Sequence, residues 1–281
     1  MTTIDLHMHS TFSDGCLAPT KLMQLLARRN VDVAALTDHD STSGLDEAFA
    51  EAATHHQLRL IPGIEISADH PYAANTDVHV LGYFIDYHDA QLQTELKHFR
   101  EDRDLRGQRM VEKLSALGYP LAWDRVKEIA QEAGVGRPHI ARAMLEKGYI
   151  AEIRDAFNGL LNDGGAAFVD RPHVSLQGAV DLIRRVGGVA VLAHPLYVAD
   201  YEYLVPRLAD IGFVGFEVHY AGFTIEQRTS LLALAHRYDM LPCGGSDYHA
   251  TGSTGETLPG SSGPPLDVLQ ELEARAAPST S

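Results

Sequence analysis

Short apolar runs alternate with amphipathic, helix-like stretches over the first hundred residues and again after residue 175. This alternation predicts a parallel sheet or barrel, because a helix between two strands returns the chain to the edge where the first strand began. The predicted strands span residues 4–8, 31–36, 58–66, 78–85, 189–193, 215–219 and 241–246, and the predicted helices among them span 19–29, 44–56, 175–186 and 225–238.

Between residues 90 and 165 the alternation of strands and helices gives way to charged amphipathic helices without a convincing strand. We therefore expect residues 91–165 to form a helical insertion that covers the site, and residues 1–90 and 166–281 to form one barrel. A loop rich in Gly, Ser, Thr and Pro precedes a short final helix. The helices expected in the insertion span residues 91–117, 123–133, 139–147 and 150–161.

The formal net charge of −15 argues against a broad surface for duplex nucleic acid. A small anionic substrate remains compatible, because bound divalent cations make a site locally positive. No stretch approaches the roughly 20 apolar residues of a membrane span, and the chain start lacks the features of a signal peptide. Two cysteines, Cys16 and Cys243, cannot form a disulfide framework, so we expect a reduced, cytoplasmic compartment.

Two histidines, His7 and His9, lie two residues apart on the first predicted strand. Both imidazoles therefore project from one face and can share a metal ion, while Ile4, Leu6 and Met8 take the opposite face. A lone pair of this kind is better explained by two incidental polar side chains. Here, however, further ligand-type residues follow along the chain.

Imidazole and carboxylate side chains recur where the predicted strands end. The carboxyl ends of barrel strands form the rim on which active sites are assembled, so we expect one polynuclear metal site there. Ligation without thiolate fits Mn²⁺, Fe²⁺ or Zn²⁺, and closely spaced ions generate a hydroxide and clamp phosphoryl oxygens. The residues are His7, His9, Asp14, Asp38, His39, Glu65, His79, His194, Asp247 and His249, whereas His55, His56, His70, His88, His98 and His236 are expected to be surface or packing residues.

Five ordered motifs resemble those of the polymerase and histidinol phosphatase (PHP) family: DLHMHS at 5–10, TDHD at 37–40, GIE at 63–65, AHP at 193–195 and GSDYH at 245–249. The resemblance implies a distorted (β/α)7 barrel with up to three divalent ions, expected to be Mn²⁺, with Zn²⁺ or Fe²⁺ as alternatives. Asp14 stands where some members have histidine. The resemblance implies one ion held by His7, His9, Glu65 and Asp247, a second by Glu65, His79 and His194, and a third by Asp14, His39 and His249.

The insertion carries the sequence GVGRPH at residues 134–139, which resembles the branch that removes the 3′-phosphate from nucleoside 3′,5′-bisphosphates and whose relatives trim short RNA from the 5′ end. Backbone N–H groups at Gly134 and Gly136 would face an anion at this helix start, and the guanidinium of Arg137 suits phosphate. His139 completes the predicted substrate-binding set. The alternative is a plain helix start, with Pro138 at its first position.

Glu217 and His219 lie two residues apart on a predicted strand, and they either approach the substrate or only support the metal ligands. His219 is a candidate proton donor for the leaving oxygen. Arg103, Arg106 and Arg109 recur at helical spacing, for which we expect a solvated helix face.

These patterns predict a metal-dependent phosphatase that converts a nucleoside 3′,5′-bisphosphate, such as adenosine 3′,5′-bisphosphate, to the 5′-monophosphate and phosphate. The alternatives are a 5′–3′ exonuclease for short oligonucleotides, a phosphatase for another ester such as histidinol phosphate, and a metal-bearing structural module like the PHP domains appended to polymerases. No duplex nucleic acid or membrane partner is expected. The predicted catalytic residues are Glu65, Asp247, His219 and Arg137.

Overall fold

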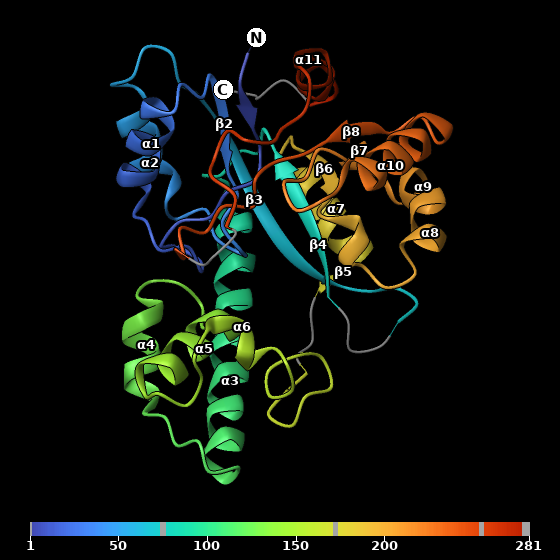
Figure 1. Ribbon diagram of the computed structural model, residues 1–281. Coiled ribbons are helices and arrows are strands. Elements are labelled where there is room, and N and C mark those ends of the chain that lie inside the picture. The colour runs from blue at the N-terminus through green and yellow to red at the C-terminus, as the bar shows by residue number, and fades with distance from the viewer. Residues whose placement is uncertain (1, 74–76, 171–173, 253–255, 277–281) are drawn as a thin grey trace.

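A curled sheet with helices around it forms one part of the molecule, and a group of helices extends from it (Figure 1). The computed structural model describes residues 2–73, 77–170, 174–252 and 256–276. Within these residues the strands are ordered β1-β2-β3-β4-β6-β7-β8, and β5 pairs with β3. Their bounds are β1 (Ile4–Asp5), β2 (Val33–Leu36), β3 (Arg59–Asp69), β4 (Asp77–Tyr83), β5 (Val174–Ser175), β6 (Val189–Leu192), β7 (Gly215–Glu217) and β8 (Leu241–Cys243).

The two ends of the sheet meet just beyond the last residues of β1 and β8. Met8 and Tyr248 form an isolated parallel bridge. The His9 N–H donates to the Tyr248 carbonyl oxygen at 2.9 Å, and the Asp247 N–H donates to the His7 carbonyl oxygen at 2.8 Å. The sheet therefore curls round on itself at one rim, and the predicted distorted α/β barrel is confirmed.

Strand β4 corrects the expectation of an all-parallel sheet, because it runs antiparallel to both β3 and β6. Only seven residues separate Asp69 from Asp77. Such a short connection joins antiparallel strands, whereas a parallel crossover needs a dozen residues or more. His79 was expected at a carboxyl end, but it lies near the start of β4. The reversed direction of the strand still brings it to the rim.

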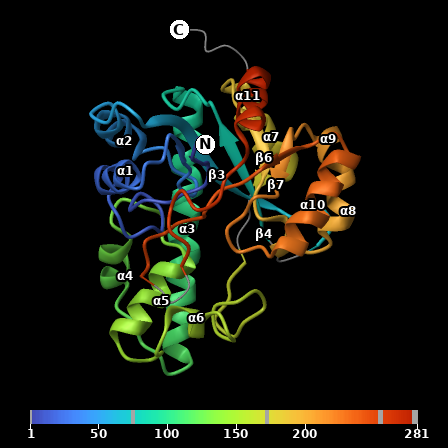
Figure 2. The same cartoon turned by 45° about the horizontal axis from the view of Figure 1, so that its top comes forward.

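The outer helices bury apolar stripes against the barrel. In α1 the stripe is Leu22, Met23 and Leu26, all fully buried, and Pro19 at the helix start presets the backbone for the first turn. The final helix contributes Val268 to the cluster inside the sheet and so closes the end far from the insertion (Figure 2). These helices are α1 (Pro19–Arg28), α2 (Leu45–Ala52), α7 (Leu176–Arg185), α10 (Ile225–Arg237) and α11 (Leu266–Arg275).

The chain between β6 and β7 forms short helical turns that were not predicted. Each is only three or four residues long, which is too short for helical periodicity to register. They are η1 (Pro195–Tyr197), α8 (Tyr201–Leu204), η2 (Val205–Arg207) and α9 (Leu208–Ile211). None of the helices in the described part combines the length and apolar character that a bilayer span requires.

The helices between β4 and β5 have a hydrophobic cluster of their own, which includes Met110, Val126 and Ile140. The first of these helices begins where the Asp89 carboxylate accepts the Leu92 N–H at 2.7 Å. The helix expected at 150–161 is only four residues long. The bounds are α3 (Ala90–Ala116), α4 (Trp123–Ala130), α5 (Arg137–Glu146) and α6 (Ile153–Ala156).

The expectation of a solvated face for the arginines of α3 is wrong for two of them. Arg106 is 7% exposed, and its Nε donates to the Val169 carbonyl oxygen at 2.8 Å. Arg103 donates from Nε to the Asp40 carboxylate at 2.6 Å and from its terminal nitrogen to the Ser67 hydroxyl at 2.7 Å. The helical spacing does place Arg103 and Arg106 on one face of α3, but both side chains bond to the rest of the protein, whereas Arg109 is exposed.

Candidate metal centre

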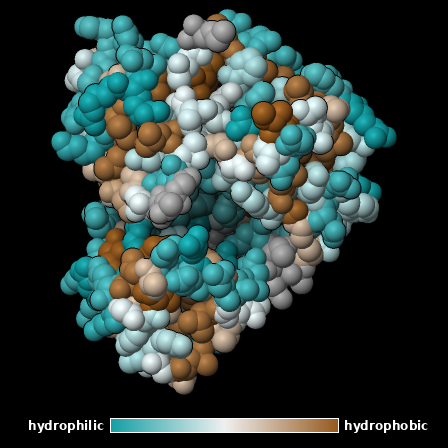
Figure 3. Space-filling view, in the orientation of Figure 1, coloured by the Kyte–Doolittle hydropathy of each residue, from teal (hydrophilic) through white to brown (hydrophobic). Residues whose placement is uncertain are grey.

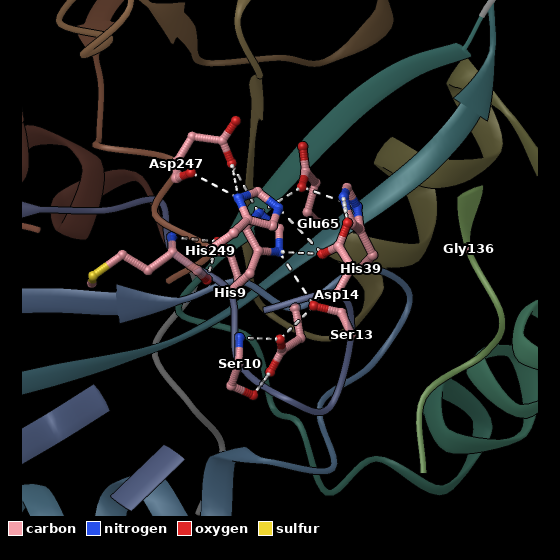
Figure 4. Close-up of polar contacts among 12 residues, drawn as sticks. His9, Ser10, Ser13, Asp14, His39, Glu65, Gly136, Asp247 and His249 are labelled. Carbon is pink, nitrogen blue, oxygen red and sulfur yellow. Dashed lines mark hydrogen bonds and ion pairs between the residues drawn. The ribbon is translucent and has the colours of Figure 1, made fainter. Parts of the chain in front are cut away.

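All nine predicted metal ligands gather at the rim where the barrel meets the insertion. They come from segments spread over most of the chain. Figure 4 shows His9, Asp14, His39, Glu65 and His249 pointing toward one another. His7 and His9 follow β1, Asp14 lies in the next loop, His39 follows β2, Glu65 lies in β3, His79 in β4, His194 follows β6, and Asp247 and His249 follow β8.

The carboxylate of Glu65 lies at the middle of this cluster and is 1% exposed. Five imidazole nitrogens approach its two oxygens, so a single carboxylate can bridge neighbouring ions. Oε2 lies 3.3 Å from His7 Nε2, 3.2 Å from His9 Nε2 and 3.0 Å from His39 Nδ1, while Oε1 lies 2.9 Å from His79 Nδ1 and 3.3 Å from His194 Nε2.

Three overlapping groups have ligand atoms within 4.8 Å of one another. They parallel the three predicted ligand sets with three differences: Asp247 is absent from the first, His39 stands in place of His194 in the second, and His9 joins the third. The remaining carboxylate, Asp247, places Oδ1 3.3 Å from His7 Nε2 and 3.1 Å from His9 Nε2. The groups are His7, His9 and Glu65; His39, Glu65 and His79; and His9, Asp14, His39 and His249.

Hydrogen bonding tests whether these residues fit divalent ions. A buried polar atom without a partner costs free energy, so native structures rarely contain several of them together. Most such side-chain atoms in the described part of the chain belong to the predicted ligands, as expected if ions complete their coordination. The ligand atoms are His7 Nε2, His9 Nε2, Asp14 Oδ1, His39 Nδ1, Glu65 Oε2, His79 Nδ1 and His194 Nδ1.

Glu217 supports two of the predicted ligands. Its Oε1 lies 3.1 Å from His7 Nδ1, and its Oε2 accepts the His194 N–H at 2.7 Å. A proton on Nδ1 of His7 leaves the Nε2 lone pair free for a metal, which is how carboxylates orient metal-binding histidines. Of the two roles considered for Glu217, these contacts match support of the ligands.

Asp38 ends a predicted strand, but it faces away from the cluster and fastens the loop before Asp14. Its carboxylate accepts the Ser10 N–H at 2.7 Å, the Ser10 hydroxyl at 2.6 Å and the Ser13 hydroxyl at 2.6 Å. The Ser13 oxygen in turn lies 3.3 Å from His9 Nδ1. Asp38 therefore acts on the site through the loop and through His9.

The charges in the centre suit cation binding. Burial raises the pKa of Glu65, but the neighbouring His39, His7 and His79 more than offset this and hold it well below its usual value. Burial lowers the pKa of His39 to about 3, against the opposing effect of Glu65 and Asp14. The carboxylate is therefore anionic near pH 7. Burial lowers the pKa of His9, but Asp247 and Glu65 more than offset this and raise it to about 10, so an ion bound there would displace a proton.

Gly245 allows the last strand to pass directly against the first histidine. A Cβ atom at this position would lie 2.4 Å from His7 Cβ, closer than side chains tolerate. Only glycine permits this approach, which lets the Asp247 N–H reach the His7 carbonyl oxygen.

A hollow of about 340 Å³ opens above the centre, between the barrel and the insertion. Residues of the cluster form part of it, namely Asp14, Asp247 and His249. Figure 3 shows a recess between the two parts with hydrophilic residues at its bottom. Arg142 and Phe157 line it from the insertion, and Tyr197 and Tyr220 line it from the barrel.

The groups expected to bind an anion at the start of α5 bond to other parts of the protein instead. Arg137 donates to the Asp163 carboxylate at 2.6 Å and to the Leu161 carbonyl oxygen at 3.2 Å. The Val135 N–H donates to Asp104. Arg137, Gly134 and Gly136 are not among the residues that line the hollow. These contacts match the alternative, a structural helix start.

His139 is also fully engaged. Its Nδ1 accepts the Gly136 N–H at 3.0 Å, and its Nε2 donates to the Ser13 carbonyl oxygen at 2.9 Å. Burial lowers the pKa of His139 to about 4, so the ring is neutral near pH 7. Both nitrogens are used inside the protein, and the predicted contact of this residue with substrate finds no support.

His219 does not join the metal ligands. Val218 and His219 both donate their N–H groups to the Cys243 carbonyl oxygen, so the strand bulges and its alternation is lost. The His219 side chain lines a separate hollow with Arg228 and residues 260–264. Its prediction as proton donor assumed a regular strand through residue 219.

Sequence reasoning missed Arg142 and Tyr197. Arg142 lies one helical turn after Pro138 on the predicted helix, a spacing that puts both on one face, and both line the hollow. Tyr197 follows the AHP motif by two residues, but nothing in its spacing distinguishes an exposed ring from a packed one.

Similarity to known proteins extends over nearly the whole chain. The model of the PHP domain family matches residues 5–161. The chain is 34% identical to the 3′,5′-nucleoside bisphosphate phosphatase of Chromobacterium violaceum over 98% of both proteins. It is also 34% identical to a 5′-3′ exoribonuclease of Haemophilus influenzae, over 87% of this chain and 89% of the relative. A solved structure of an amidohydrolase from Chromobacterium violaceum, with bound sulfate and no metal, has a TM-score of 0.86 and 32% identity over 98% of this chain and 97% of that one.

Proposed function

Because the chain belongs to the PHP domain family, and its rim carries a metal-type centre, we propose that this metal-dependent phosphoesterase removes the 3′-phosphate from nucleoside 3′,5′-bisphosphates. Similarity to the bisphosphate phosphatase over the full chain supports the proposal. We further propose Mn²⁺ as the ion, in up to three sites, because its oxygen and nitrogen preferences match these ligands.

The observation that carries the proposal is the position of Arg142. This guanidinium lines the same hollow as Asp14, Asp247 and His249, and it donates to the carbonyl oxygen of Asp14. A substrate with one phosphate at the metal centre can therefore offer a second phosphate to a planar cation nearby. Nucleoside 3′,5′-bisphosphates carry two such groups.

Bound divalent ions would supply a hydroxide nucleophile from water and neutralise the phosphoryl oxygens. The chain holds the ligands in place for this. The Tyr220 hydroxyl donates to Asp247 Oδ2 at 2.8 Å, which fixes the carboxylate beside His7 and His9. Burial and Asp247 raise the pKa of Tyr220, so it remains a protonated donor to this carboxylate across the working range.

A 5′–3′ exonuclease acting on short oligonucleotides is the second candidate. Similarity to the exoribonuclease favours it. The hollow is also open to solvent between barrel and insertion (Figure 3). Histidinol phosphate has a cationic amine where a bisphosphate has its second phosphate, and Arg142 would repel it. A purely structural module would not need the full set of unpartnered ligand atoms.

A substrate panel tests the proposal with the Mn²⁺-loaded protein. It contains adenosine 3′,5′-bisphosphate, adenosine 3′-monophosphate, a 5′-phosphorylated trinucleotide and histidinol phosphate, with phosphate and nucleotide products both measured. We expect the highest kcat/KM on the bisphosphate, with adenosine 5′-monophosphate as product. Preferential release of mononucleotides from the trinucleotide would make the protein an exonuclease instead, and no turnover on any substrate would contradict both.

A further inference from the structure

Tyr197 presents an unusually exposed aromatic ring beside the metal centre. It ends the short helix η1, is 65% exposed and lines the hollow. The centroid of its ring lies 5.8 Å from that of His194, a predicted metal ligand. Tyr197 shares this hollow with the aromatic rings of Tyr220 and Phe157, and apolar surface gathered in a hollow is typical of a ligand-binding site.

Neighbouring rings hold Tyr197 in place, although most of its surface stays exposed. Tyr220 packs against it at 5.8 Å with an interplanar angle of 83°, and Phe223 at 5.8 Å with an angle of 66°. Gly222 adds to this, since a Cβ there would come within 3.1 Å of the Tyr197 hydroxyl and 2.9 Å of the Tyr220 ring. The ring is thus a supported flat surface rather than a free side chain.

The hollow also receives Phe157 from the insertion, while Arg142 supplies its cation and the metal centre lies at its base. A ligand in this space meets anion-binding groups and aromatic surface together. A nucleotide has both complementary parts, phosphates and a planar base. Stacking on aromatic side chains is the usual way proteins hold an unpaired base.

We propose that Tyr197 is the platform on which the nucleobase of the substrate stacks. This inference rests on the proposed function, and it identifies which part of the substrate the barrel side of the hollow recognises. Stacking uses a π-face that every base has, so Tyr197 selects nucleotides over other phosphate esters without selecting one base. Purines, with their larger ring area, bind better than pyrimidines on such a surface.

The test compares Tyr197→Ala on two substrates that differ only in the base, adenosine 3′,5′-bisphosphate and the abasic 1,2-dideoxyribose 3,5-bisphosphate. We expect kcat/KM on the adenosine substrate to fall about 5- to 100-fold, mainly through KM, with little change on the abasic one. Tyr197→Phe keeps the ring and should restore most of the loss. Tyr72→Ala is the matched control, because Tyr72 is 53% exposed and is not among the residues that line the hollow.

An equal loss on both substrates, or no loss on either, overturns the inference. Metal content of each variant is measured alongside, so that a disturbed His194 is not mistaken for a lost base contact. If the wild-type protein releases no phosphate from either compound, the proposed function fails, and the platform is tested by calorimetric binding of adenosine 5′-monophosphate. A higher Kd for Tyr197→Ala than for wild type then supports the platform, and equal values overturn it.

Discussion

The imidazole of His139 reaches from the insertion to the barrel, where its Nε2 lies 2.9 Å from the carbonyl oxygen of Ser13. The next carbonyl, that of Asp14, accepts a hydrogen bond from Arg142. Helix α5 therefore holds two consecutive peptide groups of the loop that carries a predicted metal ligand. On the other side, Arg103 of α3 pairs with Asp40, the residue after His39. The insertion thus braces the loops of two ligands.

His139→Ala should weaken metal binding at the group formed by Asp14, His39 and His249. Loss of a contact that orients a ligand typically costs about 10- to 100-fold in metal affinity. We expect one ion per chain to become easily removed while the others stay, as measured by elemental analysis after graded dialysis. His98→Ala, an exposed residue of the insertion, is the control. Identical metal content in both variants would show that α5 does not position Asp14.

The same histidine predicts a pH dependence of stability. Its pKa is about 4 when folded and 6.5 when unfolded, so the unfolded chain binds the proton between these values. The stability that neutral His139 contributes is full above pH 6.5 and is lost as the pH falls toward 4, a change of about 3 kcal/mol. The destabilisation caused by His139→Gln in urea unfolding of chelated protein should therefore shrink from pH 7 to pH 4.5. A constant difference would mean that burial does not lower this pKa.

Replacing the central carboxylate should disturb more than one ion. Glu65→Gln keeps the shape of the side chain but removes the charge that faces five imidazole nitrogens. We expect the metal content to fall by about two ions per chain, because both oxygens serve neighbouring ligand groups. His55→Ala is the control, since the His55 side chain lies outside the ligand cluster, with Nε2 3.0 Å from the Glu51 carboxylate. A loss of one ion or none would remove Glu65 as a bridge.

Chelation should abolish turnover and Mn²⁺ should restore it. The nucleophile is expected to come from water activated by the divalent ions that the ligand cluster would hold. Activity is followed as phosphate release before and after exhaustive chelation. Full activity in a preparation shown by elemental analysis to be free of metal would contradict the mechanism.

Two arginine variants test which residue binds the second phosphate of the substrate: Arg137, as predicted from the sequence, or Arg142, as proposed from the structure. Arg142→Ala should lower kcat/KM on adenosine 3′,5′-bisphosphate by roughly 10- to 150-fold, the equivalent of about 1.5 to 3 kcal/mol for a charge-assisted contact. It should affect the 3′-monophosphate much less, and the metal content of the variant is measured alongside because Arg142 also holds the Asp14 carbonyl oxygen. Arg137→Ala should reduce stability through the loss of its Asp163 contact, with a smaller effect on selectivity. The opposite pattern would restore Arg137 as the phosphate ligand.

The metal-type residues were predictable from sequence because each follows a strand or lies in one, and strand ends converge in a barrel. The residues that surround these ligands could not be predicted in the same way. Whether Glu217 supports His7, or whether His219 faces away, depends on a bulge opposite Cys243 that leaves no periodic signature. The role of α5 was misassigned for a related reason. A glycine-rich helix start has the same sequence whether its N–H groups meet a ligand or, as with Gly136 and His139, another part of the chain.

Helix α3 is 27 residues long, about 40 Å from end to end, and Arg103 lies roughly 20 Å along it. A tilt of about 5° at its barrel end would carry Arg103 by close to 2 Å, enough to break its short contact with Asp40. Helix α3 therefore cannot tilt in this way without displacing Asp40, the residue next to His39. While this contact holds, the opening over the metal centre keeps one width, which is set when the protein folds rather than when a substrate arrives.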